Sequence, residues 1–241
     1  MKKVSFAAPF LKRMTVIPDK VDKGEFPFNR LTYLADEDFE LNFTAPVTFL
    51  VGENGSGKST LLEALAMACK FPVKGGSRDH LIIPDDEDPF VAALRLSWLP
   101  KVPYGFFFRA ESFFNVASFL DGVSDVSSHG GRELHCQSHG EAFLAMFVHR
   151  LNGDKRAIYL LDEPEAALSP SRQLAFLRVM WDWCQSKQVQ AIIATHSPIL
   201  MAYPDAWIYR CGADPLEWLA TLTTGNPATP WPKPAGAFSP K

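Results

Sequence analysis

The chain has 241 residues, of which 47% are hydrophobic and 21% are charged, and its formal net charge is −3. This length and apolar fraction are enough for one sizeable hydrophobic core, with room for a small inserted lobe. The slightly acidic balance excludes a global basic field that would draw the protein to nucleic acid, although a local basic patch stays open. The cysteines are scattered without paired spacing and indicate reduced thiols in a cytoplasmic protein: Cys69, Cys136, Cys184 and Cys211.

The first segment, "MKKVSFAAPFLKRM", superficially resembles a signal peptide. Its apolar stretch runs only from Phe6 to Leu11, is interrupted by Pro9, and is followed by Lys12 and Arg13. That stretch is too short for export. No run elsewhere approaches the roughly 20 apolar residues of a membrane span, so we expect no membrane segment.

Residues 1–46 indicate short strands and turns, with an acidic turn at 36–38. The continuous apolar run Val47–Val51 then predicts a strand buried on both faces of a parallel sheet. A Gly-rich turn follows, and after it comes a helix whose buried face is predicted to hold Leu61, Leu62, Leu65 and Cys69.

The turn "GENGSGKST" (52–60) matches the pattern G-x-x-x-x-G-K-[ST] between a strand and an amphipathic helix. That context predicts a phosphate-binding P-loop, because glycines let backbone N–H groups curl around phosphates while Lys58 reaches them as a point charge. The Ser59 hydroxyl is expected to ligate Mg²⁺. A plain helix-capping turn would explain the glycines but not the lysine. The expected nucleotide-binding residues are Asn54, Gly55, Ser56, Gly57, Lys58, Ser59 and Thr60.

The range of about 70–137 differs in character from its surroundings. It contains the acidic loop "PDDEDP" (84–89), the apolar run "YGFFFRAESFF" (104–114) and the small polar run "DGVSDVSSHGG" (121–131). We interpret it as a small inserted lobe.

The stretch "CQSHGEAFLAMFVHRL" (136–151) admits several interpretations. Ser138 and Glu141 have the S-x-x-E spacing of a capping box ahead of a helix. Adjacent Ser138 and His139 fit a hydrolase triad poorly, since no nucleophile elbow precedes them. A capped helix N-terminus can also hold a phosphate. The buried face is expected to hold Phe143, Leu144, Phe147, Val148 and Leu151, and a metal site would use His135, Cys136 and His139, with His129 as a further ligand.

A second buried strand, Ala157–Leu161, ends in Asp162 and Glu163. Open α/β sheets bind ligands at the carboxyl ends of their strands. Asp162 therefore fits the Mg²⁺ carboxylate of a P-loop enzyme, and Glu163 fits the group that orients or deprotonates the attacking water. The alternative is an ordinary solvated acidic turn.

A third buried strand, Ala191–Ala194, leads to Thr195 and His196, and His196 is expected to bond a γ-phosphate or hold the water. Between these strands, Ser169 and Pro170 predict the N-cap and first residue of a helix. Its buried face is expected to hold Leu174, Leu177, Trp181 and Cys184, and the chain ends in a Pro-rich tail of about 225–241. Strands that alternate with helices predict an α/β fold.

Taken together, "GENGSGKST", "SHGE", "YLLDEPE", "AALS" and "THS" resemble the ABC-type ATPases, whose motifs come in the same order. The resemblance spans 47–198 and is looser at the signature, where His139 and Glu141 depart from the family's pattern. It implies a P-loop fold with a mostly parallel sheet flanked by helices, as a single domain over 1–241. "DEPE" and "THSP" are similar to the SMC-like, RecF-like and OLD-like branch, and the chain also resembles short stand-alone bacterial ATPases.

This resemblance implies hydrolysis of ATP with Mg²⁺, catalysed by Glu163 and His196, in an ATP-sandwiched homodimer. Ser138 and Gly140 would then bind the ATP of the partner subunit, and Ser169 would occupy the D-loop. The implied context is DNA repair or phage defence, with a nucleic acid or protein client. The alternatives are the nucleotide-binding subunit of a transporter and a non-hydrolysing nucleotide sensor. Glu111 is the candidate for the Q-loop position, and Tyr33 is the candidate for the adenine-stacking aromatic, with an ordinary core position as the alternative for Tyr33.

Overall fold

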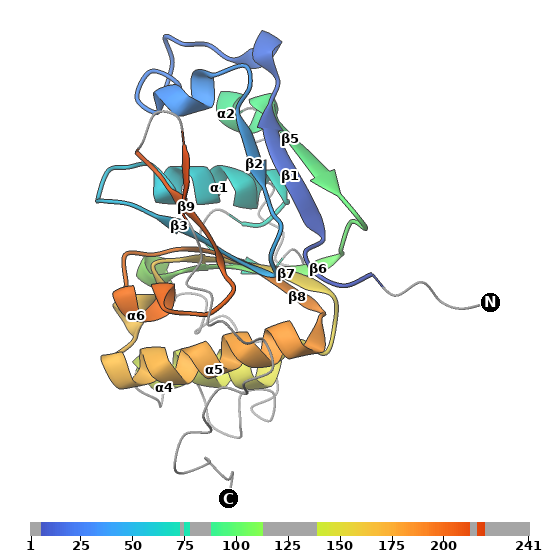
Figure 1. Cartoon of the computed structure of the whole chain (residues 1–241), viewed down its shortest axis with the longest axis vertical. Helices are drawn as coiled ribbons and strands as arrows, with labels where there is room; N and C mark the ends of the chain where they lie inside the picture. Colours follow the sequence, from blue (N-terminus) through green and yellow to red (C-terminus); the bar gives the residue numbers. More distant parts are fainter. Residues whose placement is uncertain (1–5, 73–74, 78–87, 113–138, 213–215, 220–241) are drawn as a thin grey trace, which may run out of the picture.

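The computed structural model describes residues 6–72, 75–77, 88–112, 139–212 and 216–219. Their strands form two sheets, one of seven strands and one of three, with helices between and below them (Figure 1). The strands are β1 Leu11–Val16, β2 Glu40–Asn42, β3 Val47–Val51, β4 Gly76–Ser77, β5 Leu94–Trp98, β6 Tyr104–Arg109, β7 Ala157–Asp162, β8 Val189–Ala194, β9 Trp207–Arg210 and β10 Glu217–Leu219. The helices are α1 Lys58–Ala68, α2 Pro89–Ala93, α4 His139–Ala145, α5 Pro170–Ser186 and α6 Pro198–Met201, with short turns η1 Pro18–Lys20, η2 Thr32–Ala35, η3 Ala110–Ser112, η6 Met146–Arg150 and η7 Pro164–Ala167.

The seven-stranded sheet has the order β10-β9-β3-β8-β7-β6-β4. Its five inner strands are parallel, whereas β10 and β4 pair antiparallel at the edges. Every residue of β3, β7 and β8 is buried, as the continuous apolar runs of the sequence predict. The α/β class is therefore confirmed, and the carboxyl ends of β3, β7 and β8 lie at one edge.

The three-stranded sheet, β2-β1-β5, is antiparallel and lies across α1 from the larger sheet (Figure 1). Gln190 of β8 fastens β1 to the larger sheet although its side chain is fully buried. Its Oε1 accepts from the backbone N–H groups of Phe10 and Leu11 at 2.8 Å each, and its Nε2 donates to the carbonyl of Leu11 at 2.9 Å. A buried amide is stable only when so paired, so this contact fixes where β1 begins.

The larger sheet separates two hydrophobic clusters. Leu160 of β7 packs in the upper cluster with α1 and the three-stranded sheet, whereas its neighbour Leu161 packs in the lower cluster with α4 and α5. The lower cluster contains a group of aromatic rings with centroids 4.5–6.0 Å apart: Phe108, Phe143, Phe147, Phe176 and Trp183. Burying one such side chain contributes about 2 kcal/mol, so this group anchors α4 and α5 under the sheet.

The range expected to form an inserted lobe is partly built into the two sheets. Within it, β5 pairs with β1, and β6 pairs with β7 in the parallel part of the larger sheet. The described parts therefore do not form a separate lobe. The reason is long-range pairing, which the local composition of 70–137 does not reveal. The rest of this range, and the Pro-rich tail of 225–241, lie outside the described residues.

Two predicted helix faces are partly wrong. Leu174 of α5 is 57% exposed, whereas Phe176, Met180 and Trp183 form the buried stripe with Leu177. After α4, Val148 is 48% exposed although Phe143, Phe147 and Leu151 are buried as expected. The cause is a π-helical turn over Met146–Arg150, in which the N–H of Leu151 reaches back to the carbonyl of Met146 at 3.0 Å. The wider turn shifts the helix phase.

Candidate nucleotide site

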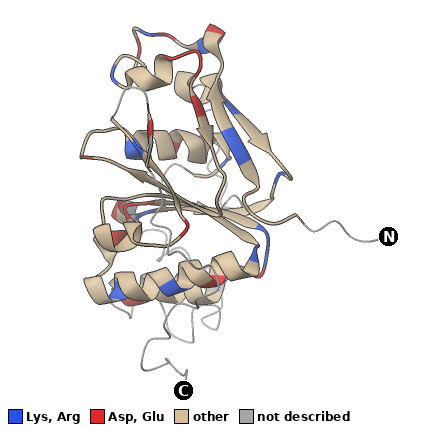
Figure 2. Cartoon of the chain, in the orientation of Figure 1, with Lys and Arg blue, Asp and Glu red and all other residues tan. Residues whose placement is uncertain are grey.

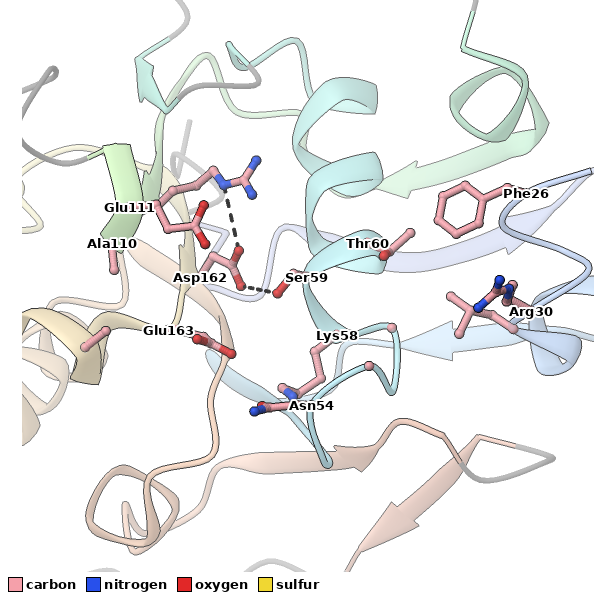
Figure 3. Close-up of a pocket in the computed structure, with 15 residues that line it drawn as sticks. Phe26, Arg30, Asn54, Lys58, Ser59, Thr60, Ala110, Glu111, Asp162 and Glu163 are labelled. Atoms are coloured by element: carbon pink, nitrogen blue, oxygen red, sulfur yellow. Dashed lines mark hydrogen bonds and ion pairs between the residues drawn. The ribbon is translucent and has the colours of Figure 1, made fainter.

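A cavity of about 680 Å³ opens where α1 begins and where β6 and β7 end. Its lining combines the P-loop with the acidic end of β7 and the turn η3, and Figure 3 shows these side chains around one space. The site residues among them are Asn54, Gly55, Gly57, Lys58, Ser59, Thr60, Asp162 and Glu163. The sequence-predicted P-loop and strand-end acids therefore share one cavity. A second hollow of about 520 Å³ adjoins it along Gly52–Ser56.

Gly57 is the N-cap of α1 and has a left-handed backbone, with φ of 91°. A β-carbon at this position would lie 2.5 Å from the side chain of Leu31. Glycine is required here both for the backbone angle and for the close approach of Leu31. The N–H groups of the first turn of α1 consequently face the cavity, where the helix dipole favours an anion.

Lys58 is only 4% exposed, and its Nζ donates to two P-loop carbonyls. The distances are 2.9 Å to the oxygen of Gly52 and 3.0 Å to that of Glu53. These bonds hold the ammonium group across the loop. A phosphate that enters the cavity would offer the same ammonium a charged partner, which makes a stronger hydrogen bond than a neutral carbonyl.

Ser59 and Asp162 meet at the cavity wall, where the serine Oγ donates to Oδ1 of Asp162 at 2.9 Å (Figure 3). Burial raises the pKa of Asp162 to about 6, while the hydrogen bond from Ser59 and the charge of Arg109 act in the opposite direction. A hydroxyl and a carboxylate at this short separation offer the oxygen ligands that Mg²⁺ takes beside nucleotide phosphates. The two residues therefore fit the metal that the sequence implies.

Arg109, the last residue of β6, lies between two carboxylates. Its Nη1 is 3.0 Å from Oε1 of Glu63 on α1, and its Nε is 3.9 Å from Oδ2 of Asp162. The guanidinium thus partly balances the buried charge of Asp162 and links β6 to α1. No local motif marks Arg109 or Glu63 as site residues, although "FFFRAES" ends a strand just as "LLDEP" does.

Glu163 adopts a left-handed backbone with φ of 47°, which is unusual for a residue with a side chain. Its N–H donates to the carbonyl of Ala194 at 2.9 Å, so the turn after β7 is tied to the end of β8. His196 lies just beyond β8, with its Nδ1 3.6 Å from Oε1 of Glu163 and 3.6 Å from Oε1 of Glu165. The two expected catalytic side chains are therefore neighbours.

Glu165 is a functional candidate that the sequence analysis missed. Its carboxylate is buried, and Oε1 accepts from Thr195 Oγ1 at 2.7 Å and from the N–H of His196 at 2.8 Å. Only a comparison of "DEPE" with the polar residues of "THS" could have suggested this contact.

Gly140 packs against the start of α5. A β-carbon there would lie 2.6 Å from Cδ of Arg172 and 3.1 Å from the carbonyl of Ala167. Nη2 of Arg172 is also 3.1 Å from Oε1 of Glu141. Ser169 is the N-cap of α5 as predicted, and its Oγ lies 3.1 Å from Oγ of Ser171. Four expected residues lie outside the part of the chain that the structure describes: Ser138 and the metal-ligand candidates His129, His135 and Cys136. The side chain of His139 also lies outside that part.

The candidates for the adenine-stacking aromatic and the Q-loop residue lie in different places. Tyr33 is 3% exposed, packs in the upper hydrophobic cluster and lines the second hollow along Gly52–Ser56, not the main cavity. Phe26, by contrast, is 62% exposed and lines the cavity together with Arg30 and Glu111.

No group of three or more His, Cys, Asp or Glu side chains in the described ranges could hold a metal ion. The described cysteines, Cys69, Cys184 and Cys211, form no disulfide with one another, and no described helix could span a bilayer.

Two family models match the chain. One, described as an AAA domain, covers residues 28–89, and the other, an AAA domain of AbiEii-toxin type (Type IV TA system), covers residues 142–202. The first spans the P-loop, and the second spans Glu163, Ser169 and His196. With the motif order and the strand-end geometry, they show a P-loop ATPase domain that resembles the ABC-type ATPases.

Within this class, the chain is similar to proteins of different kinds. Hemin import ATP-binding protein HmuV of Nocardia farcinica is 30% identical over 183 residues, which are 66% of this chain and 61% of that protein. Molybdate import ATP-binding protein MolC of Haemophilus influenzae is 27% identical over 168 residues, and 65% of it is covered. The chain therefore spans less than two thirds of these relatives.

The SMC- and RecF-like branch is also represented. DNA replication and repair protein RecF of a Synechococcus species is 42% identical over 50 residues, 21% of this chain and 13% of that protein. The SMC head domain from Thermotoga maritima has 16% identity and a TM-score of 0.42, with 87% of this chain and 98% of that chain covered.

Proposed function

We propose that this chain binds and hydrolyses ATP with Mg²⁺, as one domain in the cytoplasm. The observation that carries the proposal is the contact of Ser59 with Asp162 at 2.9 Å, next to the N-terminus of α1 and Lys58. A helix N-terminus, a lysine and an oxygen pair for Mg²⁺ are the parts that a nucleoside triphosphate needs.

In this proposal, Asn54, Gly55, Ser56, Gly57 and Thr60 hold the phosphates through the loop backbone and the start of α1. Lys58 reaches the β- and γ-phosphates, and Ser59 and Asp162 hold Mg²⁺. The metal would neutralise charge that develops on the transferred phosphoryl group. Phe26 and Arg30, on the far side of the cavity, are positioned for the base.

Glu163 would orient or deprotonate the attacking water, and His196 would bond the γ-phosphate. The left-handed backbone of Glu163 aims its side chain from the strand end toward the cavity, and His196 lies 3.6 Å from it. Strained backbone of this kind costs about 1–3 kcal/mol and is found at functional sites. General-base catalysis contributes about 10²–10⁴-fold in rate.

We further propose an ATP-sandwiched homodimer. Gly140 at the start of α4 and Ser169 at the start of α5 would face the nucleotide held by the partner subunit, together with Ser138. Packing of Gly140 on Arg172 and Ala167 supports the grouping of these residues where α4 and α5 begin. The proposed context is DNA repair or phage defence, which RecF and the toxin–antitoxin description of the second family model favour.

The test is the Glu163→Gln variant, which keeps size and most hydrogen bonding but removes the base. With Mg·ATP, the variant should accumulate as a dimer in light scattering and lose about 10²–10⁴-fold in turnover, while wild-type protein returns to monomer. Glu37→Gln, which makes the same change at an exposed carboxylate in the acidic turn of 36–38, is the matched control and should behave as wild type. A Glu163→Gln variant with full turnover would overturn the catalytic assignment. A variant that stays monomeric would overturn the shared site.

A transporter subunit is the second candidate, because HmuV and MolC carry import in their names. Co-purification with a membrane protein would favour it. A non-hydrolysing sensor would bind ATP with unchanged affinity in the wild type and in Glu163→Gln, and neither form would turn it over.

A further inference from the structure

Beyond the nucleotide cavity, polar side chains form a buried chain of hydrogen bonds under the ends of β7 and β8. Five described residues take part: Glu165 of η7, Gln173 of α5, and Thr195, His196 and Ser197 after β8. Buried polar groups are costly unless they are paired, so such a network in a core of aromatic and aliphatic side chains calls for a function.

In the first half of the network, Glu165 binds the backbone of His196 and the side chain of Thr195. Oε1 of Glu165 accepts from Thr195 Oγ1 at 2.7 Å and from the backbone N–H of His196 at 2.8 Å. Glu165 is 9% exposed, and its other oxygen, Oε2, is buried with no hydrogen-bond partner among the described residues. A carboxylate would not be kept in this position for stability alone, because an unpaired buried oxygen is destabilising.

The second half ties the same loop to α5. Ser197 Oγ donates to Oε1 of Gln173 at 2.6 Å, and the N–H of Ser197 donates to Thr195 Oγ1 at 3.0 Å. Gln173, also 9% exposed, uses its Nε2 to donate to the carbonyl of Leu168 at 3.2 Å. Its backbone N–H donates to the carbonyl of Ser169 at 2.9 Å.

The two halves enclose the residues proposed to act on ATP. His196 is held on one side by Glu165, two positions after Glu163, and on the other side through Ser197 by Gln173. The imidazole itself stays 53% exposed, and its Nδ1 lies 3.6 Å from Oε1 of Glu163, which lines the cavity. The backbone of the histidine is therefore fixed, whereas its ring is available to a ligand.

We propose that Glu165 and Gln173 are positioning residues that fasten the His196 loop to the turn between Glu163 and α5. This inference rests on the proposed function, since it concerns how His196 is placed against the γ-phosphate. The same turn carries Ser169, and the neighbouring Arg172 covers Gly140. The placement of His196 in one protomer's own site is thereby coupled to the surface that meets the partner's nucleotide.

The experiment uses near-isosteric variants of the full chain. Gln173→Met and Thr195→Val remove the side-chain hydrogen bonds of these residues and keep the size of the side chain. Thr195→Ser keeps the hydroxyl that bonds Glu165, and Glu165→Gln keeps the oxygen that accepts these bonds. Gln185→Met is the matched control, because Gln185 is an exposed glutamine on the same helix. The nucleotide Kd should stay within about twofold in all of them.

Turnover should separate the two groups. Gln173→Met and Thr195→Val should lower kcat by about 10- to 100-fold with KM little changed, since small displacements of a catalytic group are costly. Thr195→Ser, Glu165→Gln and Gln185→Met should retain most of the wild-type kcat. A loss of ATP binding that parallels the loss of kcat would instead indicate general unfolding and would overturn the positioning role.

A double-mutant cycle gives the sharpest readout. If Gln173 and Thr195 act through His196, then Gln173→Met or Thr195→Val should cost little more in a His196→Ala background. Fully additive losses would overturn the inference while leaving ATP hydrolysis intact, so this failure differs from failure of the proposed function.

If the wild-type protein does not hydrolyse ATP, the proposed function fails and hydrogen exchange decides the inference by itself. In Gln173→Met, amide exchange at Thr195–Ser197 should accelerate, with the P-loop amides unchanged. Unchanged exchange at His196 and Ser197 would show that Gln173 does not hold the loop.

Discussion

Ser59 and Asp162 are 103 positions apart in the chain, yet the hydroxyl of one donates to the carboxylate of the other at 2.9 Å. Ser59 belongs to the first turn of α1, and Asp162 is the last residue of β7. The contact brings a helix start and a strand end to a common point, where Asp162 remains 7% exposed. The burial of this carboxylate makes it a source of instability as well as a proposed Mg²⁺ ligand.

Asp162→Asn should therefore stabilise the fold at neutral pH. Burial raises the pKa of Asp162 from its ordinary 3.8 to about 6, so the folded state binds the proton more tightly than the unfolded chain. Above pH 6 the ionised carboxylate costs stability on the order of 1–3 kcal/mol, and this cost disappears as the pH falls below 3.8. Thermal melting without nucleotide should show a higher Tm for the variant at pH 7.5.

The pH dependence is the control for this prediction. The gain in Tm should shrink as the pH falls through 6, while Glu37→Gln should give no comparable gain at any pH. An Asp162→Asn protein that melts lower than wild type at pH 7.5 would contradict the cost assigned to the buried charge. The same variant should lose Mg²⁺-dependent turnover.

Lys58→Ala should lose most ATP binding. Its ammonium lies buried across the P-loop, within 3.0 Å of the carbonyls of Gly52 and Glu53. Removal of a charged donor to phosphate costs about 1.5–3 kcal/mol or more, which is about 10- to 100-fold in Kd. Titration of a fluorescent ATP analogue measures it, and Lys155→Ala, at the other end of β7, serves as the matched control. Near-wild-type affinity in a folded Lys58→Ala protein would refute the P-loop assignment.

Gly57→Ala should destabilise the protein more than Gly55→Ala. Both glycines have positive φ, 91° and 81°, but a β-carbon on Gly57 would meet Leu31 at 2.5 Å, whereas Gly55 has nothing within 4 Å. Backbone strain costs both variants about 1 kcal/mol, and the collision adds a second cost to Gly57→Ala. Urea unfolding measures the difference. Equal losses in the free energy of unfolding for the two variants would show that the Leu31 side chain moves aside at no cost.

Phe26→Ala should weaken the binding of ATP without weakening the binding of its phosphate groups. The ring is 62% exposed at the cavity wall, and stacking of a base on an aromatic ring is worth about 1–3 kcal/mol. ATP affinity should therefore fall by about 5- to 100-fold, while inorganic tripolyphosphate binds as before. Phe26→Trp should retain affinity. If ATP and tripolyphosphate weaken together, Phe26 does not contact the base.

The sequence was informative where one local pattern determines both structure and chemistry. The runs Val47–Val51 and Ala157–Leu161 are predominantly apolar and are buried at every position, as a strand covered on both faces requires, and each is followed by residues that line the cavity. Ser169 and Pro170 likewise gave the start of α5, because an N-cap followed by proline is a local signal.

Other features depend on contacts that no local pattern carries. The pairing of β1 with β5 joins residues about 80 positions apart, and their composition does not select this partner. The buried stripe of α5 was misplaced because apolar residues occur on both sides of it, so Leu174 looked as suitable as Phe176. Glu165 and Gln173 are polar residues in a core, and only their mutual geometry shows what they bind.

The partition of the core by the seven-stranded sheet bears on how such a chain can diverge. Above the sheet, Phe71 and Leu160 pack with α1 under the nucleotide loop, and below it Phe176 and Trp183 pack with α4 and α5. A substitution in one layer is most easily compensated by a neighbour in the same layer, because packing adjusts locally. Substitutions that repack the layer of α4 and α5 are therefore expected to leave the geometry of the cavity at the start of α1 largely unaltered.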